Sequence, residues 1–169
     1  MLCDTSTTKN EEIRLGTITP DNWRIFNGLK VKENQQSYVP SNVVILARAF
    51  AYREYNSCVY PIYKGDTPIG LLMQRDYEEN HRLLCVLEEF MIAEQYQGKG
   101  YGKVAMDLWL SIIKYENKYA SIILCYIEGN ERARDFYLRM GFKHTGVIDE
   151  DEVVMEYDLK ERITPSDNQ

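Results

Sequence analysis

Three glycines alternate with larger residues near the middle of the chain, in the stretch Gln-Gly-Lys-Gly-Tyr-Gly-Lys at residues 97–103. This stretch follows an apolar run at 83–92 and precedes a segment of helical periodicity at 103–115. Because glycines leave the backbone bare, the N–H groups of such a loop can point at one anion, and the start of the following helix favours negative charge. The spacing predicts a site for a phosphorylated cofactor, and the alternative is a glycine-rich turn without a ligand.

Two common phosphate-binding loops do not fit this stretch. A P-loop needs Ser or Thr after its Gly-Lys pair to hold magnesium, whereas Gly100 follows Lys99 and Val104 follows Lys103. A dinucleotide-binding loop follows the first strand and has an acidic residue about twenty positions later. Here the loop lies mid-chain, and residues 121–124 are Ser-Ile-Ile-Leu without an acid.

Two adjacent acids, Glu88 and Glu89, interrupt the apolar run at 83–92. A charge in such a run is costly unless it has a function or a partner. Because consecutive strand residues point to opposite sides, we expect one acid to face a cleft and the other to face another surface. A carboxylate in a cleft could act as a general base, whereas a strand edge with two solvated acids is the alternative.

Tyr137 is a candidate proton donor. It falls at helical spacing on an apolar stripe with Ala133, Phe136 and Met140. The same position suits a core tyrosine with a satisfied hydroxyl, and periodicity alone favours that alternative.

The cysteines and histidines suggest neither a metal site nor a covalent route. No Cys-x-x-Cys pair occurs, and His81 and His144 lack ligand spacing, so no structural metal is expected. Cys85 and Cys125 lie in apolar runs, with no neighbouring base or helix N-terminus to lower the pKa of their thiols. Neither cysteine is therefore expected to carry a group between substrates. If the protein transfers a group, direct transfer between two substrates bound together in a ternary complex is preferred.

Length and composition predict one α/β domain over residues 1–169, with a core at about 11–160 and flexible termini. No apolar run reaches the roughly 20 residues of a membrane span, and no signal peptide is evident, so a cytoplasmic protein with no membrane partner is expected. The net charge of −6 argues against nucleic acid and is compatible with a small cationic substrate, although solubility explains it equally well.

Periodicity and turn residues predict the elements that position these groups. Strands are expected at 13–18, 57–63, 68–75, 83–92, 121–126, 142–148 and 153–159. Helices are expected after Pro20, after residues 40–42 with Ser41 or Asn42 as cap, at 103–115, and between a cap at Asn130 and an end at Gly141. In the 103–115 helix, the predicted buried stripe is Ala105, Leu108, Trp109 and Ile112.

This element order resembles that of the GNAT superfamily of N-acetyltransferases. The pattern Gln-x-x-Gly-x-Gly at 97–102 is similar to the family's pyrophosphate loop, and residues 130–142 resemble its Asn-x-x-Ala-x-x-Phe-Tyr-x-x-x-Gly-Phe helix. The resemblance implies a mixed, mostly antiparallel sheet of about seven strands flanked by helices. It also implies acetyl-coenzyme A as co-substrate, no metal, and a homodimer.

The resemblance assigns roles to particular residues. Residues 87–92 look like a segment of spermidine/spermine acetyltransferases in which the first acid is the base and the second holds the polyamine, which implies Glu88 as base and Glu89 as substrate ligand. Tyr137 would be the acid near the coenzyme sulfur. The implied cofactor-binding residues are Phe90, Met91, Ile92, Gln97, Gly98, Lys99, Gly100, Tyr101, Gly102, Lys103, Asn130 and Ala133.

The acceptor is the least constrained part of the prediction. Residues 33–42, Glu-Asn-Gln-Gln-Ser-Tyr-Val-Pro-Ser-Asn, resemble a stretch of bacterial diamine and polyamine acetyltransferases, which favours a polyamine and places Tyr38 at the acceptor site. Tyr38 as a helix-packing aromatic is the alternative. An aminoglycoside-like antibiotic or a protein N-terminus remains an alternative acceptor, and a non-catalytic coenzyme A-binding module remains an alternative function.

Overall fold

A computed structural model describes residues 12–159. The strands are β1 (Ile13–Leu15), β2 (Cys58–Lys64), β3 (Thr67–Glu79), β4 (Arg82–Ile92), β5 (Ser121–Ile127), β6 (Lys143–Asp149) and β7 (Glu152–Asp158). The α-helices are α1 (Trp23–Asn27), α2 (Asn42–Ala51), α3 (Tyr101–Glu116) and α4 (Glu131–Arg139). Single 3₁₀ turns are η1 (Glu33–Gln35), η2 (Arg53–Tyr55) and η3 (Glu94–Tyr96). The predicted polar termini and Cys3 lie outside the described residues.

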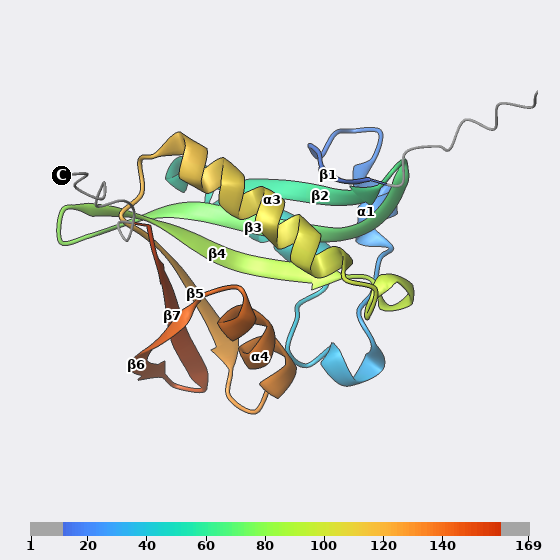
Figure 1. The fold of residues 1–169 in the computed structure, drawn as a ribbon. Coiled ribbons are helices and arrows are strands. Elements are labelled where there is room, and N and C mark those ends of the chain that lie inside the picture. The colour runs from blue at the N-terminus through green and yellow to red at the C-terminus, as the bar shows by residue number, and fades with distance from the viewer. Residues whose placement is uncertain (1–11, 160–169) are drawn as a thin grey trace, which may run out of the picture.

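The seven strands form one sheet in the order β1-β2-β3-β4-β5-β7-β6. Every neighbouring pair is antiparallel except β4 and β5, which are parallel. The prediction of a mixed, mostly antiparallel seven-stranded sheet is confirmed. Figure 1 shows α3 running across the strands on one face of the sheet and α4 beside β5.

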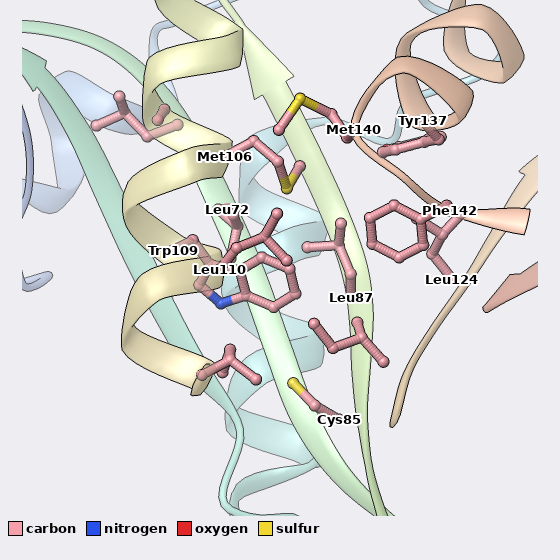
Figure 2. Packing of buried hydrophobic residues seen from close by; sticks show 14 of the residues in the cluster. Leu72, Cys85, Leu87, Met106, Trp109, Leu110, Leu124, Tyr137, Met140 and Phe142 are labelled. Carbon is pink, nitrogen blue, oxygen red and sulfur yellow. The ribbon is translucent and has the colours of Figure 1, made fainter. Parts of the chain in front are cut away.

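Apolar side chains pack on both faces of the sheet. On the α3 face, Trp109 is fully buried, and Figure 2 shows it with Leu110 over Leu72 of β3 and Leu87 of β4. On the other face, Phe26 of α1 packs in a smaller cluster, whose other buried members are Val31, Leu71 and Met91. Leu71 and Leu72 thus face opposite sides, as strand alternation requires.

The buried face of α3 differs from the predicted stripe. Ala105 and Trp109 are buried as expected, but Leu108 is partly exposed and Ile112 is only half-buried. The positions buried in addition are Met106, Leu110 and Ile113. The sheet covers a wide face of α3, rotated from the predicted stripe, because the helix contacts strands as far apart as β1 and β4.

Several element boundaries also differ from those predicted. The first strand ends at Leu15 rather than at residue 18, the strand predicted at 68–75 extends to Glu79, and α3 starts at Tyr101 rather than at residue 103. Ser41 is the N-cap of α2 but makes no capping hydrogen bond through its side chain. Asn42 is instead buried, and its Nδ2 donates to the Phe26 carbonyl at 2.6 Å, which ties α2 to the end of α1.

The strands β4 and β5 pair over only part of their length, and this gap positions the site. Their register runs from Cys85 opposite Ile122 to Leu87 opposite Leu124 and extends no further along the described strands. Beyond Leu87, β4 continues to Ile92 while pairing with β3 alone. The sheet therefore splays open at this end, which carries Phe90, Met91 and Ile92, three of the residues that the resemblance implied as cofactor-binding.

Candidate active site

A cleft of about 450 Å³ opens where β4 and β5 part. Its walls come from the end of β4, the glycine loop, the first turn of α3, α4, and the segment between α1 and α2. Of the predicted residues, those that line it are Tyr38, Phe90, Met91, Ile92, Gln97, Gly98, Gly100, Gly102, Lys103, Asn130, Ala133 and Tyr137. The glycine loop and the second motif, far apart in sequence, thus meet at one cavity.

The glycine loop has the backbone expected of an anion site. Gly98 and Gly100 have φ angles of 76° and 83°, a region that other residues enter only with strain. Gly100 is the N-cap of the 16-residue helix α3, whose first turn has neither a side-chain cap nor an acid. The helix start is therefore open to an external anion, and the residues present fit the pyrophosphate of a coenzyme.

The side chains of two loop residues, Gln97 and Lys99, hold the loop in place through hydrogen bonds. The side-chain amide of Gln97 donates to the Ile92 carbonyl and to Oε1 of Gln35, both at 2.8 Å. Lys99 Nζ donates to the Gln95 carbonyl at 3.0 Å. Gln97 thus fixes the loop to β4 and to the segment that carries Tyr38.

Lys99 and Tyr101 do not line the cleft. The Lys99 ammonium lies 5.9 Å from the ring centre of Tyr96. The Tyr101 ring packs against the main core, and the Lys64 ammonium lies 5.4 Å from its centre. Of these two side chains, neither is placed by the geometry to contact a ligand in the cleft.

The second motif forms the opposite wall. Asn130 caps α4, because its Oδ1 accepts from the Ala133 N–H at 3.2 Å. Tyr137 is nearly buried between the rings of Phe136 and Phe142, with centroid distances of 5.4 and 5.8 Å. Figure 2 shows Tyr137 on α4 beside Phe142 and apart from Trp109. Tyr137 is therefore both a packed aromatic residue and part of the cleft wall.

The hydroxyl of Tyr137 stays protonated at neutral pH. Burial raises the pKa of Tyr137, and the charge of Glu89 raises it further. A hydroxyl with a raised pKa is a weak acid, so it suits a hydrogen bond to a developing anion better than early proton release.

Glu88 and Glu89 lie on a β-bulge. Met73 of β3 pairs with Glu89 and Gln74 pairs with Leu87, so Glu88 has no partner in the register. A bulge disturbs the alternation of a strand and redirects side chains. As a result, both acids reach one guanidinium: Arg48 Nη1 lies 2.6 Å from Glu89 Oε1 and 3.7 Å from Glu88 Oε2. The expectation that the two acids face opposite surfaces is wrong.

The two carboxylates are similarly buried and differ in their charged partners, and neither of them lines the cleft. Their side chains are only 14% and 12% exposed. Arg75 Nε donates to Glu88 Oε1 at 2.5 Å. Burial raises the pKa of Glu89 to about 7, although Arg48 lowers it, and the charge of Glu88 adds to the rise. Glu89 thus titrates near neutral pH, as a general base at that pH requires.

Sequence reasoning missed several cationic residues at the site. Arg48 and Arg75 contact the acids, while Arg132 and Arg139 line the cleft with Lys103. Arg48 and Glu89 are 41 positions apart, and only the fold brings them together. The two arginines of α4 could have been found, because they lie within the same motif as Asn130 and Tyr137.

The thiols are not activated. Burial and the nearby charges of Glu152, Glu88 and Asp149 raise the pKa of Cys125 to about 11, and burial raises the pKa of Cys85. Within residues 12–159, no group of three or more His, Cys, Asp or Glu side chains is placed to hold a metal ion. None of the helices in this range is long and apolar enough to cross a bilayer.

Known proteins resemble this chain in sequence and in fold. Residues 21–142 match the acetyltransferase (GNAT) family. A spermine/spermidine N(1)-acetyltransferase of Bacillus subtilis is 34% identical over 141 residues, which cover 81% of this chain and 91% of that protein.

Two solved structures share the fold at low identity. A spermidine N-acetyltransferase of Vibrio cholerae, in complex with CoA and spermine, has a TM-score of 0.68 at 19% identity, over 89% of this chain and 97% of that one. An aminoglycoside acetyltransferase in complex with coenzyme A has a TM-score of 0.72 at 14% identity, over 87% and 95% of the two chains. Proteins with different acceptors therefore share this architecture.

Proposed function

Because this chain belongs to the acetyltransferase (GNAT) family, it is an N-acetyltransferase that uses acetyl-coenzyme A, and we propose that its acceptor is a polyamine such as spermidine or spermine. The observation that carries the proposal is the pair Glu88 and Glu89, nearly buried together on the bulge of β4. Two carboxylates that directly precede Phe90, a residue of the cleft wall, suit a flexible chain of ammonium groups. The Bacillus subtilis relative supports the same substrate class.

We assign different parts of the coenzyme to different groups of cleft residues. We assign the pyrophosphate to the glycine loop and the start of α3, with Lys103, Arg132 and Arg139 as counter-charges. The edge of β4 at Phe90, Met91 and Ile92, which has no β5 partner, is assigned to the amides of the coenzyme arm. The thioester supplies the acetyl group once the coenzyme is bound.

Residues of the chain then assist three steps of the reaction: removal of a proton from the amine, stabilisation of the oxyanion, and departure of the sulfur. An alkylamine has a pKa near 10.4 and arrives protonated, so the Glu88–Glu89 pair takes one proton from it. Backbone N–H groups at the end of β4 stabilise the charge on the thioester oxygen. Tyr137 donates a hydrogen bond to the departing sulfur. Tyr38, which lines the cleft on the side of α2, is assigned to the acceptor.

Release of the coenzyme A thiol tests this function. Purified protein is mixed with acetyl-coenzyme A and a single amine, and thiol release is followed. The proposal predicts release that depends on spermidine or spermine. A non-catalytic binding module would bind acetyl-coenzyme A and release no thiol with any amine.

The proposal also includes the cellular location, the oligomeric state and the partners of the protein. We place the chain in the cytoplasm as a homodimer that binds neither nucleic acid nor membrane, as the resemblance and the net charge of −6 imply. Light scattering coupled to size-exclusion chromatography tests the dimer. A single species of about 20 kDa, near the chain mass of 19.8 kDa, would contradict it.

A further inference from the structure

Arg48 covers the acid pair from the side of α2. Its guanidinium contacts both carboxylates, and its side chain is 36% exposed, compared with 12% for Glu89. Among the described residues, no other side chain donates a hydrogen bond to Glu89. A partly exposed cation is thus paired with two nearly buried acids. None of the three lines the cleft, but Phe90, the residue that follows Glu89 on β4, does.

Glu88 is held in a different way. Its Oε1 accepts from Arg75 Nε, and several neighbours fix Arg75 in turn. The Arg75 guanidinium lies 4.8 Å from the ring centre of Tyr52, and its Nη1 donates to the Asp76 carbonyl at 3.4 Å. With a side chain only 18% exposed, Arg75 is a fixed counter-charge. Movement of Arg48 would therefore leave Glu88 paired and Glu89 available.

We propose that Arg48 occupies the acceptor subsite in the free enzyme and yields it to an ammonium group of the substrate, and that Glu89, rather than Glu88, then takes the proton from the attacking amine. This inference rests on the proposed function and deepens it. Arg48 acts through Glu89, so it is a positioning residue, whereas Glu89 is the catalytic base.

The groups around Glu89 show why a cation must replace Arg48. They come from five elements: Arg48 on α2, Arg75 on β3, Glu88 on β4, Tyr137 on α4 and Glu152 on β7. Arg48 lowers the pKa of Glu89, while burial and the two other acids raise it. If Arg48 left without replacement, Glu89 would be protonated at neutral pH and could not act as base.

The proton and electron balance follows from these positions. A proton moves from the acceptor ammonium to Glu89, and the nitrogen lone pair then forms the C–N bond with the acetyl carbon. The C–S bond breaks, and its electron pair leaves with sulfur. The second proton of the nitrogen ends on that sulfur, with Tyr137 as hydrogen-bond donor there, and Glu89 releases its proton to solvent. One protonated amine and one thioester thus give one amide, one thiol and one proton.

This arrangement selects for acceptors with more than one charge. The reacting nitrogen must be neutral when it attacks, so it cannot also replace the charge of Arg48. A polyamine has a second ammonium group that can do so, whereas a monoamine has none. Displacement of Arg48 therefore favours polyamines over monoamines of similar length.

The pH profile of kcat/KM for spermidine tests the proposal in three variants. In the wild type, the acidic limb should have its midpoint near 7, where Glu89 titrates. In Arg48→Gln the midpoint should move up by about one to two pH units, as expected for loss of an adjacent opposite charge. Arg48→Lys should restore it, and Glu89→Gln should abolish the limb.

A matched control removes a charge elsewhere. Arg53, just after α2, donates to the Phe50 carbonyl at 3.1 Å and lies 4.6 Å from the centre of the Phe50 ring, and among the described residues it pairs with neither acid. Arg53→Gln should leave the midpoint in place. An unchanged midpoint in Arg48→Gln, or a wild-type acidic limb in Glu89→Gln, would overturn the proposal and return the role of base to Glu88.

A measurement without turnover separates this inference from the proposed function. NMR titration of ¹³C-labelled glutamate carboxyls in the free protein should show one group near pH 7 that is absent in Glu89→Gln and shifted upward in Arg48→Gln. Failure of the wild type to acetylate any polyamine would refute the proposed function. Normal turnover with no shifted carboxyl in Arg48→Gln would refute the role of Arg48 alone.

Discussion

Arg48 Nη1 lies 2.6 Å from Glu89 Oε1 and 3.7 Å from Glu88 Oε2, so one guanidinium joins two consecutive residues of one strand. Consecutive residues of a regular strand point to opposite faces. The bulge in β4 is what allows this relationship, because it leaves Glu88 outside the register with β3. The same part of β4 lies beyond its last pairing with β5. The acid pair and the open edge of β4 therefore lie in the same part of the strand.

Replacement of Gly100 by Val should weaken the binding of acetyl-coenzyme A at least tenfold, or by about 1.4 kcal/mol. A β-branched residue at a φ of 83° is strained, so the loop must shift away from the backbone path that fits a pyrophosphate. Isothermal titration calorimetry measures the affinity. Gly146→Val is the matched control, because Gly146 has a φ of 85° in β6 and an equally open Cβ position.

Both glycine variants should lose comparable stability, about 1–3 kcal/mol for such strain. Only the Gly100 variant should lose affinity for the coenzyme. Wild-type affinity in a folded Gly100→Val protein would remove the loop from the coenzyme site.

Tyr137→Phe should lower kcat on the order of 10²-fold while leaving the dissociation constant of acetyl-coenzyme A nearly unchanged. Phe preserves the ring contacts with Phe136 and Phe142 and removes only the hydroxyl. Single-turnover kinetics with calorimetry separates the two effects. Tyr157→Phe is the control, since Tyr157 also packs on Phe142, at 5.4 Å, but does not line the cleft. Equal kcat values in both variants would exclude Tyr137 as donor.

Arg139→Gln should weaken acetyl-coenzyme A binding roughly 3- to 10-fold and reduce its dependence on salt, because one counter-charge of the phosphates is lost. Affinity is measured at several salt concentrations. Arg134→Gln, on the same helix but paired with Asp135 at 2.9 Å and absent from the cleft lining, should change neither quantity. Identical salt dependence in both variants would contradict the placement of the phosphates beside α4.

The stability of the wild type should fall, relative to Glu89→Gln, as pH rises from about 4.5 to 7. The pKa of Glu89 is raised on folding, so in this window the folded state holds a proton that the unfolded state has released, and ionisation favours unfolding. The difference should reach at most about 3 kcal/mol and level off above pH 7. Urea unfolding at several pH values measures it. A difference independent of pH would mean that Glu89 titrates normally when folded.

The chain order of elements and the two motif segments could be predicted because each depends on local signals. Glycine spacing marks the loop before α3, and Asn130 and Gly141 mark the ends of α4. Both segments meet at the cleft, as the family resemblance implied.

The relationship between Glu88 and Glu89 could not be predicted from local pattern. Alternation assigned them to opposite faces, and nothing in the sequence of β4 marks the bulge that overrides it. Arg48 and Arg75 reach the acids from other elements, so their contacts depend on tertiary packing. The buried face of α3 differs from the predicted one for a similar reason, because the strands beneath the helix determine which of its sides is covered.

The most direct test of the polyamine assignment is a competition in one reaction. Wild-type protein receives acetyl-coenzyme A with spermidine, spermine, a monoamine of similar length, an aminoglycoside and a peptide with a free N-terminus, all at equal concentration. Mass spectrometry then quantifies each acetylated product at early times. Acetylspermidine or acetylspermine is predicted to dominate, and its share should fall as salt rises because screening weakens the attraction of a polycation. An acetylated aminoglycoside or peptide as main product would contradict the assignment.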